Sequence, residues 1–355
     1  SWALNGLRMA SAVLLLPLLV LRLSPEDLGM HYVLLSLGAL APILDFGFSG
    51  AVWRAVSHAA AGGEDLPEFG KELSPVGTNQ PNTALMWQLL TTARRLYQRL
   101  AVVAAVVVGP LGMVLVGIGV AETSSTARTW LAAAVTLTLA VWEVYASWWS
   151  SYLMGLNQVV LYTRLNFIAY LLKLAGSALL LWLGAGLLSV PVAGLVSVVI
   201  QRALARRACL RVLGTEPLMT TTEAIGRGLL ARLWPNASRV GLLGLGGYVG
   251  GQAMAFLCLA TLGLAANAQY GLSLQIIGVV QGMAMTWTQV KWPLLAQQRS
   301  RGDLAGMRHV FRERLWLQLG TFAVLAPLAL PLGPAFLHWL GTDKVMLPMM
   351  WMVVL

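Results

Sequence analysis

The chain has 355 residues, of which 58% are hydrophobic and only 11% are charged. A water-soluble globule of this length needs more polar surface than this composition supplies, so a soluble domain is excluded and a membrane protein is favoured. The formal net charge is +10, and the two cysteines are too few for a disulfide framework or a metal site, so redox chemistry gains no support.

Long apolar runs recur along the whole chain. A helix needs about 20 apolar residues to cross a hydrocarbon core of roughly 30 Å. Backbone amides find no water inside lipid, and the period-two pattern of a membrane barrel is absent, so the runs must be helices. The sequence therefore predicts an all-α polytopic membrane protein. In chain order, we expect spans at residues 4–23, 31–56, 100–121, 130–154, 165–183, 187–205, 241–262, 265–294 and 315–332, with a tenth that begins at Val345.

The two ends of the chain make this helix count a minimum. The first run lacks a basic leader and a cleavage site and is followed directly by another span, so we interpret it as a membrane helix rather than a signal peptide. The chain starts at Ser1 and stops at Leu355 inside an apolar run. We therefore expect further helices beyond one or both ends.

Basic residues are unevenly divided between alternate loops. If the N-terminus is cytoplasmic, nineteen of the 24 lysine and arginine residues, Arg202 among them, fall in cytoplasmic loops. Only Arg22, Arg128 and Lys344 fall in outer loops. This positive-inside pattern predicts a cytoplasmic N-terminus and large basic loops in the cytoplasm. The positive charge is thus explained by topology, and we expect no nucleic acid as a partner.

Loop lengths divide the chain into two lobes. We expect a six-helix bundle over residues 1–210, a cytoplasmic basic linker over 211–236, and a second bundle over 237–355, of which about four helices are present. The hairpins at 23–62 and 262–302 share length and hydropathy, which predicts two pseudo-repeated bundles around a central cavity, the second incomplete. Parallel repeats are common in secondary transporters, which bind substrate between their lobes.

Four ionisable residues fall near the centres of predicted spans: Arg8, Asp45, Glu143 and Lys173. A charge at this depth costs about 2.5–3.5 kcal/mol, so it needs a partner or a water-filled cavity. Residues equally far from a hairpin turn lie at the same depth, which places Arg8 level with Asp45, and Glu143 level with Lys173. Two interpretations stay open: two neutralised pairs that join neighbouring helices, or a hydrophilic cavity that binds substrate.

Polar side chains recur on single helical faces around these charges, and a lone salt bridge does not need a whole polar face. The stripes therefore favour the cavity. In the second lobe the stripe is weaker, because serine and threonine in membrane helices often serve packing alone. The three stripes are Asn166, Tyr170, Lys173 and Ser177; Asn5, Arg8 and Ser11; and Ser273, Gln281, Thr288 and Lys291.

Further cations lie near the cytoplasmic ends of spans: Arg54, Arg164, Arg239 and Lys291. Snorkelling towards lipid headgroups explains each one alone. Together they suit an anion-binding vestibule, because arginine makes paired hydrogen bonds to a diphosphate. The candidate substrate-binding residues are therefore Arg8, Asp45, Arg54, Glu143, Lys173, Arg239 and Lys291.

The seventh predicted span is rich in glycine, which lowers helix stability and permits close packing or bending. Gly247 and Gly251 form a GxxxG pair, which favours close packing against another helix. A hinge for alternating access is the alternative interpretation.

Three segments resemble one superfamily of transporters. Residues 23–57 (LSPEDLGMHYVLLSLGALAPILDFGFSGAVWRAVS), with Gly29 in the turn, the DFGFS run from Asp45 and then Arg54, resemble the first hairpin of polysaccharide and O-antigen flippases. These flippases belong to the multidrug/oligosaccharidyl-lipid/polysaccharide exporter superfamily. The segments YLMGLNQVVLYTRLNF and WPLLAQQRSRGD resemble the connection after the fourth helix and the end of the eighth helix of that family.

The resemblance implies two six-helix bundles around a central cavity in the cytoplasmic (inner) membrane. The implied cargo is a polyprenyl-diphosphate-linked oligosaccharide, carried from the cytoplasmic to the outer leaflet by alternating access. The implied partners are membrane lipids, a polysaccharide polymerase and glycosyltransferases. Cavity arginines on the first two helices and an aspartate on the second are implicated in such flippases, and Arg8, Arg54 and Asp45 occupy similar places here. No covalent step is needed, so we do not expect an enzyme.

Three other functions stay open, one of which is a non-transporting scaffold, against which the polar stripes argue. A multidrug extruder of the same fold is expected to have an acidic, aromatic cavity, whereas the charges here balance acids with bases. A membrane-embedded glycosyltransferase or polymerase needs a sizeable outer loop or a carboxylate pair near a leaflet surface, and the sequence shows neither. The histidines have no catalytic or metal spacing, so we expect no catalytic residue, metal or cofactor. They are His31, His58, His309 and His338.

Overall fold

The computed structural model describes residues 14–63, 81–213, 223–291, 294–295, 298, 303–342 and 346–347, and regular structure within them is helical. A helical segment at residues 14–22 comes first. The following helices are α2 (Pro25–Gly38), α3 (Ala41–Leu44), α4 (Phe48–Ala60), α5 (Thr83–Gly119), α6 (Thr126–Gly155), α7 (Val159–Trp182), α8 (Ser189–Leu213), α9 (Glu223–Gly250), α10 (Met254–Gln289) and α12 (Leu304–Trp339). Short 3-10 turns at Val120–Glu122 and Gly186–Leu188 lie between α5 and α6 and between α7 and α8.

Seven helical stretches in the described part of the chain are long and apolar enough to cross a membrane, which confirms an all-α polytopic membrane protein. One stretch, Ala237–Gln289, has 53 residues and contains the predicted span at 241–262 and most of the one at 265–294. A straight helix of that length measures about 80 Å, far more than one bilayer. Inside α10, however, Gly263 has φ 82° and ψ −178°, so the helix breaks between the two predicted spans.

Helix α5 shows how the bundle separates lipid-facing from protein-facing side chains. Val102, Val106 and Val114 are 64%, 68% and 63% exposed, whereas Ala104 and Gly112 are buried on the other face. Membrane helices pack through small residues because lipid solvates large aliphatic side chains as well as a protein interior does. The apolar outer surface of α5 is therefore the surface expected of a helix in lipid.

Several helices extend beyond the predicted spans. Helix α5 begins at Thr83, before the expected start at residue 100, and the Asn82 side chain caps it by accepting from the Leu85 amide at 3.0 Å. The predicted linker at 211–236 is shorter in the structure, because α8 continues to Leu213 and α9 begins at Glu223. The predicted spans were identified by hydropathy, so these polar and basic helical extensions were not detected.

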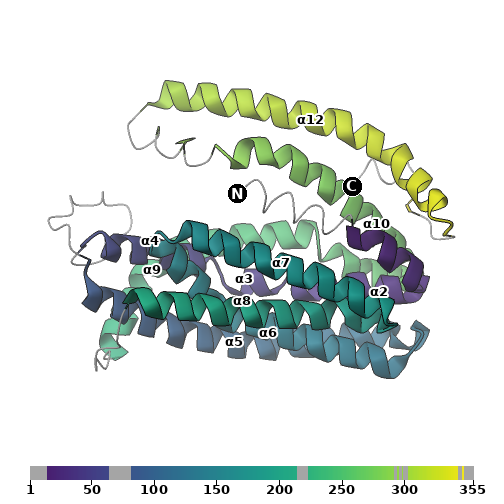
Figure 1. The fold of residues 1–355 in the computed structure, drawn as a ribbon, viewed down its shortest axis with the longest axis horizontal. Coiled ribbons are helices and arrows are strands. Elements are labelled where there is room, and N and C mark those ends of the chain that lie inside the picture. Colours follow the sequence, from purple (N-terminus) through teal and green to yellow (C-terminus); the bar gives the residue numbers. More distant parts are fainter. Residues whose placement is uncertain are drawn as a thin grey trace.

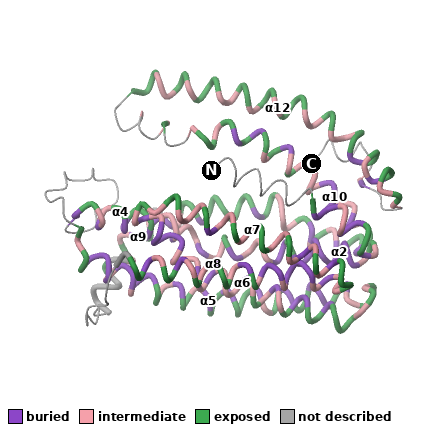
Figure 2. The backbone as a smooth tube through the Cα atoms, in the orientation of Figure 1, coloured by how far each residue is buried: buried purple, intermediate pink, exposed green. Residues whose placement is uncertain are grey.

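Figure 1 shows α5, α6, α7 and α8 side by side along the long axis of the molecule, and neighbouring members of this layer pack together. Helix α10 packs against α2 at one end of this layer and also against α12. Figure 2 shows buried residues concentrated in the α5–α8 layer, whereas α12 is largely exposed. In α12 only Gly333 and Leu337 are buried.

The second predicted span is broken into three pieces, α2, α3 and α4. Between α3 and α4, Phe46 and Gly47 both have positive φ, at 47° and 74°. Glycine adopts this conformation without steric penalty. Gly47 also permits close approach of α9, since an added Cβ there would lie 2.6 Å from Val240 Cβ. The break places Asp45 in a turn inside the bundle.

Close contacts join α2 to the part of α10 that follows its break. The Asn267 amide donates to the Gly29 backbone oxygen at 2.9 Å, and the Tyr32 hydroxyl donates to Gln275 Oε1 at 2.7 Å. A Cβ at Gly29 would overlap the Leu264 carbonyl group. We call these five residues the α2–α10 contact; it packs backbone against backbone and is tied by specific hydrogen bonds.

Candidate functional site

A cavity lined by both polar and apolar residues lies between α3, α4, α6, α7 and α8. Its volume of about 570 Å³ is within the range of about 300–1,000 Å³ typical of small-molecule sites. We call it the polar chamber. Serine hydroxyls, side-chain amides and ionisable groups line it, together with aromatic rings. These residues are Asp45, Ser49, Trp53, Glu143, Ser147, Ser150, Ser151, Tyr162, Asn166, Tyr170, Lys173, Ser197, Gln201 and Arg202.

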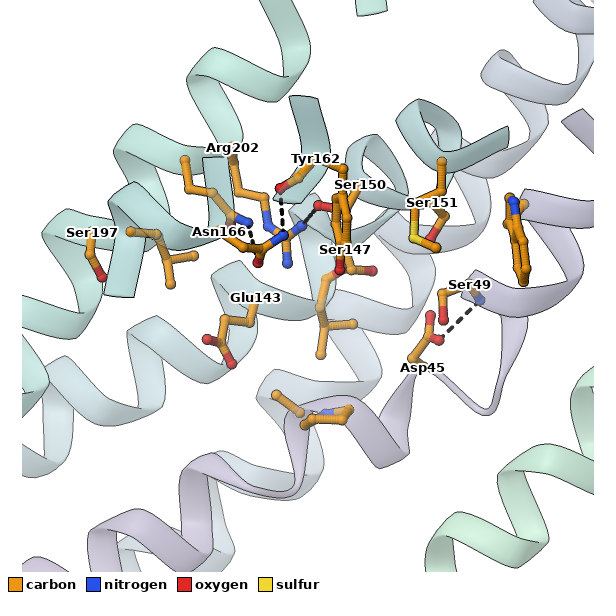
Figure 3. A pocket seen from close by; sticks show the side chains of 18 of the residues that line it. Asp45, Ser49, Glu143, Ser147, Ser150, Ser151, Tyr162, Asn166, Ser197 and Arg202 are labelled. Atoms are coloured by element: carbon orange, nitrogen blue, oxygen red, sulfur yellow. Dashed lines mark hydrogen bonds between the residues drawn. The ribbon is translucent and has the colours of Figure 1, made fainter. Parts of the chain in front are cut away.

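Asp45 is held in place by the broken helix. Its Oδ2 accepts a hydrogen bond from the Ser49 backbone N–H at 3.0 Å, in the first turn of α4 (Figure 3). The residue is only 6% exposed, and its Oδ1 is buried without a hydrogen-bond partner among the described residues. One carboxylate oxygen of the chamber wall is therefore anchored by the Ser49 amide, and the buried Tyr97 hydroxyl of α5 lies beside the carboxylate.

Glu143 of α6 lines the same chamber as Lys173 of α7, as the hairpin spacing predicted. The positive charges of Lys173 and Arg202 both act on the Glu143 carboxylate. The structure therefore groups two acids, Asp45 and Glu143, with two bases, Lys173 and Arg202, around one space.

A hydrogen-bond network ties together the helices that form the chamber wall. Arg202 of α8 donates from Nη1 to Ser150 Oγ of α6. Gln201 donates to Asn166 Oδ1 at 3.0 Å, and Asn166 donates to the Tyr162 backbone oxygen at 2.9 Å (Figure 3). The Nε of Arg202 is buried and has no hydrogen-bond partner in the described part of the chain.

A second chamber of about 500 Å³ lies between α2, α7, α8 and α10. Tyr170 and Lys173 line both chambers, so the two spaces adjoin at α7. Leucine side chains from several helices make the second chamber more apolar than the first. Its other polar lining residues are His31, Tyr32, Ser36, Gln252, Tyr270 and Gln275.

Three candidate residues that the structure describes line neither chamber. Arg54 of α4 and Arg239 of α9 are exposed, and Lys291 is partly buried just beyond α10. Arg8 lies outside the described residues, as do Asn5 and Ser11. Of the seven candidates, the structure brings together Asp45, Glu143 and Lys173.

Three of the four residues of the predicted polar stripe on α7, namely Asn166, Tyr170 and Lys173, line the chamber; the fourth, Ser177, is buried and lines neither chamber. The second-lobe stripe has a packing role instead. Thr288 donates to Gln318 of α12 at 2.5 Å, and Ser273 donates to a backbone oxygen of its own helix. Hydroxyl groups on α10 thus serve contacts within and between helices.

The GxxxG pair does not form a close helix contact in the structure. A Cβ at Gly247 would meet no atom within 4 Å, and one at Gly251 would meet only the Gly247 oxygen. Helix α9 ends at Gly250 and α10 starts at Met254, so the glycines accompany a turn. Gly241 does pack closely, since an added Cβ there would lie 2.7 Å from the Phe46 ring.

Sequence reasoning missed Arg202 and Gln201. Arg202 was assigned to a cytoplasmic loop because Arg206, Arg207 and Arg211 follow it closely. In the structure it belongs to α8 and faces the chamber. Its position inside the predicted span at 187–205, next to a glutamine, was the signal that could have identified it.

No group of three histidine, cysteine, aspartate or glutamate side chains is placed to hold a metal ion in the described part of the chain. Comparisons with protein-family models, with curated proteins and with solved structures found no match. The functional argument therefore rests on the geometry and chemistry of the two chambers.

Proposed function

We propose that this chain is a flippase that moves a polyprenyl-diphosphate-linked oligosaccharide from the cytoplasmic to the outer leaflet by alternating access. The polar chamber inside membrane-spanning helices is the observation that carries the proposal. A hydrophilic headgroup that crosses a bilayer must exchange its hydration water for protein groups, because unsatisfied polar groups in hydrocarbon cost several kcal/mol. The hydroxyl, amide and charged groups of the chamber supply that exchange.

The outer surface of the helices supports a lipid-borne cargo. Large aliphatic side chains cover α5, and α12 is exposed along most of its length. In the proposed mechanism the prenyl chain remains in lipid beside the protein while the saccharide enters the polar chamber. In this mechanism the diphosphate is assigned to the candidate cations that the structure places outside the chamber, Arg54, Arg239 and Lys291.

The charge of the chamber favours this cargo over the organic cations of a multidrug extruder. Among the lining residues that the structure describes, the formal charges of Asp45 and Glu143 are matched by those of Lys173 and Arg202, whereas a cation-binding cavity is expected to be acidic. The excess of basic residues in alternate loops supports a cytoplasmic N-terminus, and moving Arg202 from a loop to the chamber leaves that excess almost unchanged.

Reconstitution in liposomes tests the proposal. We expect the full chain to move a fluorescent, short-chain polyprenyl-diphosphate saccharide between leaflets, measured by its accessibility to an external quencher. Arg202→Gln should lower the rate at least about tenfold, because it removes one of the two positive charges of the described chamber lining, and a barrier raised by about 1.4 kcal/mol slows a rate tenfold. Retention of helicity and a single size-exclusion peak should show that the variant is folded.

The matched control is Arg207→Gln, which removes an exposed arginine from the same helix. Its rate should equal that of the wild type. Absence of saccharide-lipid movement by the wild type, or equal loss in both variants, would contradict the proposal. Transport of ethidium by the same liposomes would identify the extruder instead.

A further inference from the structure

The exposed side of α5 changes from aliphatic to basic along the helix. Val106 and Val102 are 68% and 64% exposed, on the surface expected to meet lipid. Towards the start of the helix, Arg99 and Arg94 are exposed as well. Arg99 and Val102 are spaced i and i+3, so they share one helix face. The side of α5 that meets acyl chains therefore continues into arginines.

Helix α8 shows the same change at the end of the bundle where α5 begins. Its exposed stripe includes Val196, Val199 and Ile200, which are 52%, 39% and 38% exposed. Towards the end of the helix the stripe continues with Arg206, which is also exposed. A membrane helix changes in this way where hydrocarbon gives way to headgroups, because an arginine there can extend its charge to the interface.

The arginines of the two helices lie at one level, on either side of α6. Figure 1 shows α6 between α5 and α8, and α6 packs against both. Tyr97 of α5, Trp148 of α6 and Cys209 of α8 are buried in one hydrophobic cluster. Trp149 and Leu96 are equally far from the turn that joins α5 to α6, which places Arg94 only about 3 Å along the axis from the level of Trp149.

Arg206 is positioned by an aromatic ring of α6. Its guanidinium carbon lies 6.0 Å from the centre of the Trp149 ring, within reach of a cation–π interaction. Trp149 in turn stacks on Trp148 at a ring separation of 3.9 Å, and its backbone oxygen accepts a hydrogen bond from the Cys209 thiol. An arginine held through its flat face keeps the N–H groups along its edge for paired hydrogen bonds to a phosphate.

Tryptophan side chains indicate that this level is the headgroup region. Indole rings concentrate where the hydrocarbon core meets the headgroups. Trp149 is partly buried beside Arg206. Trp234 of α9 is 52% exposed and follows Leu233, which belongs to the same buried cluster. The exposed arginines of α5 and α8 are therefore at the depth of phospholipid phosphates.

A phospholipid fits this surface better than a soluble anion does. A free phosphate would use the arginines alone and would leave the aliphatic stripes without a role in binding. A phospholipid uses both features, since its phosphate meets the arginines while its acyl chains follow the valines. Basic residues beside a membrane favour anionic lipids over neutral ones.

We propose that Arg94, Arg99 and Arg206 bind the phosphate of an anionic phospholipid, whose acyl chains lie along the aliphatic stripes of α5 and α8. None of the three arginines lines either chamber, so this lipid is a partner from the surrounding bilayer and not the cargo. The site does not depend on the flippase function, and failure of the flippase assay would leave it unchanged.

Binding of defined lipids to the full chain in a neutral detergent tests the site. Dioleoyl phosphatidylglycerol is the anionic probe, and dioleoyl phosphatidylcholine is the neutral probe with the same acyl chains. Native mass spectrometry counts the lipids bound. We expect the wild type to bind phosphatidylglycerol at least about tenfold more tightly than phosphatidylcholine. Equal binding of the two lipids would overturn the site, as would displacement of phosphatidylglycerol by an equal concentration of inorganic phosphate.

A paired variant and a matched control separate a defined site from general attraction by positive charge. Arg94→Gln combined with Arg206→Gln should weaken phosphatidylglycerol binding at least about tenfold and leave phosphatidylcholine binding unchanged. Arg207→Gln combined with Arg312→Gln also removes two exposed arginines, one of them about 100° around α8 from Arg206, and should bind like the wild type. Equal losses in the two pairs would overturn the proposal.

Folding of the paired variant is checked without added lipid. A single size-exclusion peak and an unchanged unfolding midpoint should show that the variant is folded. If it is not, Arg99→Gln alone replaces it, and we expect a severalfold loss of phosphatidylglycerol binding. Unchanged binding by a folded Arg99→Gln variant would overturn the site.

Discussion

The polar chamber and the α2–α10 contact differ in how closely their helices pack. In the chamber, α3, α4, α6, α7 and α8 surround a space of about 570 Å³. In the contact, Asn267 and Tyr32 donate across the helix interface at 2.9 and 2.7 Å, and the Gly29 backbone packs directly against the Leu264 carbonyl group. The difference indicates that the contact supplies stability through close packing, whereas the chamber leaves space that a ligand can occupy. Substitutions in the contact should therefore change folding, and substitutions in the chamber should change function.

Gly29→Ala should have the largest effect on stability. The added methyl would overlap the Leu264 carbonyl group, and backbone atoms cannot move aside as a side-chain tip can. Overpacking of this kind costs about 1–3 kcal/mol, occasionally more. Thermal unfolding of the detergent-solubilised chain, followed by tryptophan fluorescence, should show a clearly lower midpoint.

Gly38→Ala is the matched control for that experiment, since Gly38 lies on the same helix and an added Cβ there meets nothing within 4 Å. Its midpoint should remain near that of the wild type. Equal midpoints for the two variants would show that α2 and α10 are not as close as the structure places them.

Asn267→Ala should have an intermediate effect. It removes the hydrogen bond to the Gly29 oxygen, and interhelical hydrogen bonds in membrane proteins contribute about 0.6 kcal/mol on average and up to about 1.7 kcal/mol. The same unfolding measurement should place its midpoint between those of Gly29→Ala and wild type.

Thr261→Ala on the same helix controls for loss of a polar group. Thr261 is exposed, and its hydroxyl bonds only to Leu257 O within α10. If Thr261→Ala lowered the unfolding midpoint as much as Asn267→Ala, the hydrogen bond across the α2–α10 contact would not be more stabilising than one at a lipid-facing position.

Val106→Ala should have the smallest effect, because this side chain is 68% exposed on the outer face of α5 and loses only lipid contacts. Ala104→Val, two residues away, enlarges a side chain that is 1% exposed and should lower the midpoint. A larger drop in the midpoint for Val106→Ala than for Ala104→Val would mean that the buried and lipid-facing sides of α5 are exchanged.

The sequence predicted much of the fold because hydropathy is a local property. The predicted boundary between residues 262 and 265 coincides with the break at Gly263. Glu143 and Lys173 are equally far from their hairpin turn, so counting residues predicted that they lie at the same depth. In the structure both line one chamber.

Other features depend on packing between distant segments and left no local signal. The second chamber needs α10 to meet α2 and α7, which no spacing rule predicts from these sequences. The inward direction of Arg202 depends on how α8 is rotated against α6, and charge counting by loop assigned it to the wrong environment. The candidate cations Arg54 and Arg239 were grouped by their depth in the membrane alone. Depth does not specify whether a side chain lies on the chamber side of its helix.

The break between α3 and α4 also has an electrostatic consequence. Because α4 starts inside the bundle rather than at a membrane surface, the partial positive end of its backbone dipole, roughly half an elementary charge, faces the interior. The Ser49 amide that bonds Asp45 belongs to this terminus. The chain thereby provides Asp45 with a counter-charge made of peptide groups, which cannot be titrated, swing away or be removed by replacing a side chain.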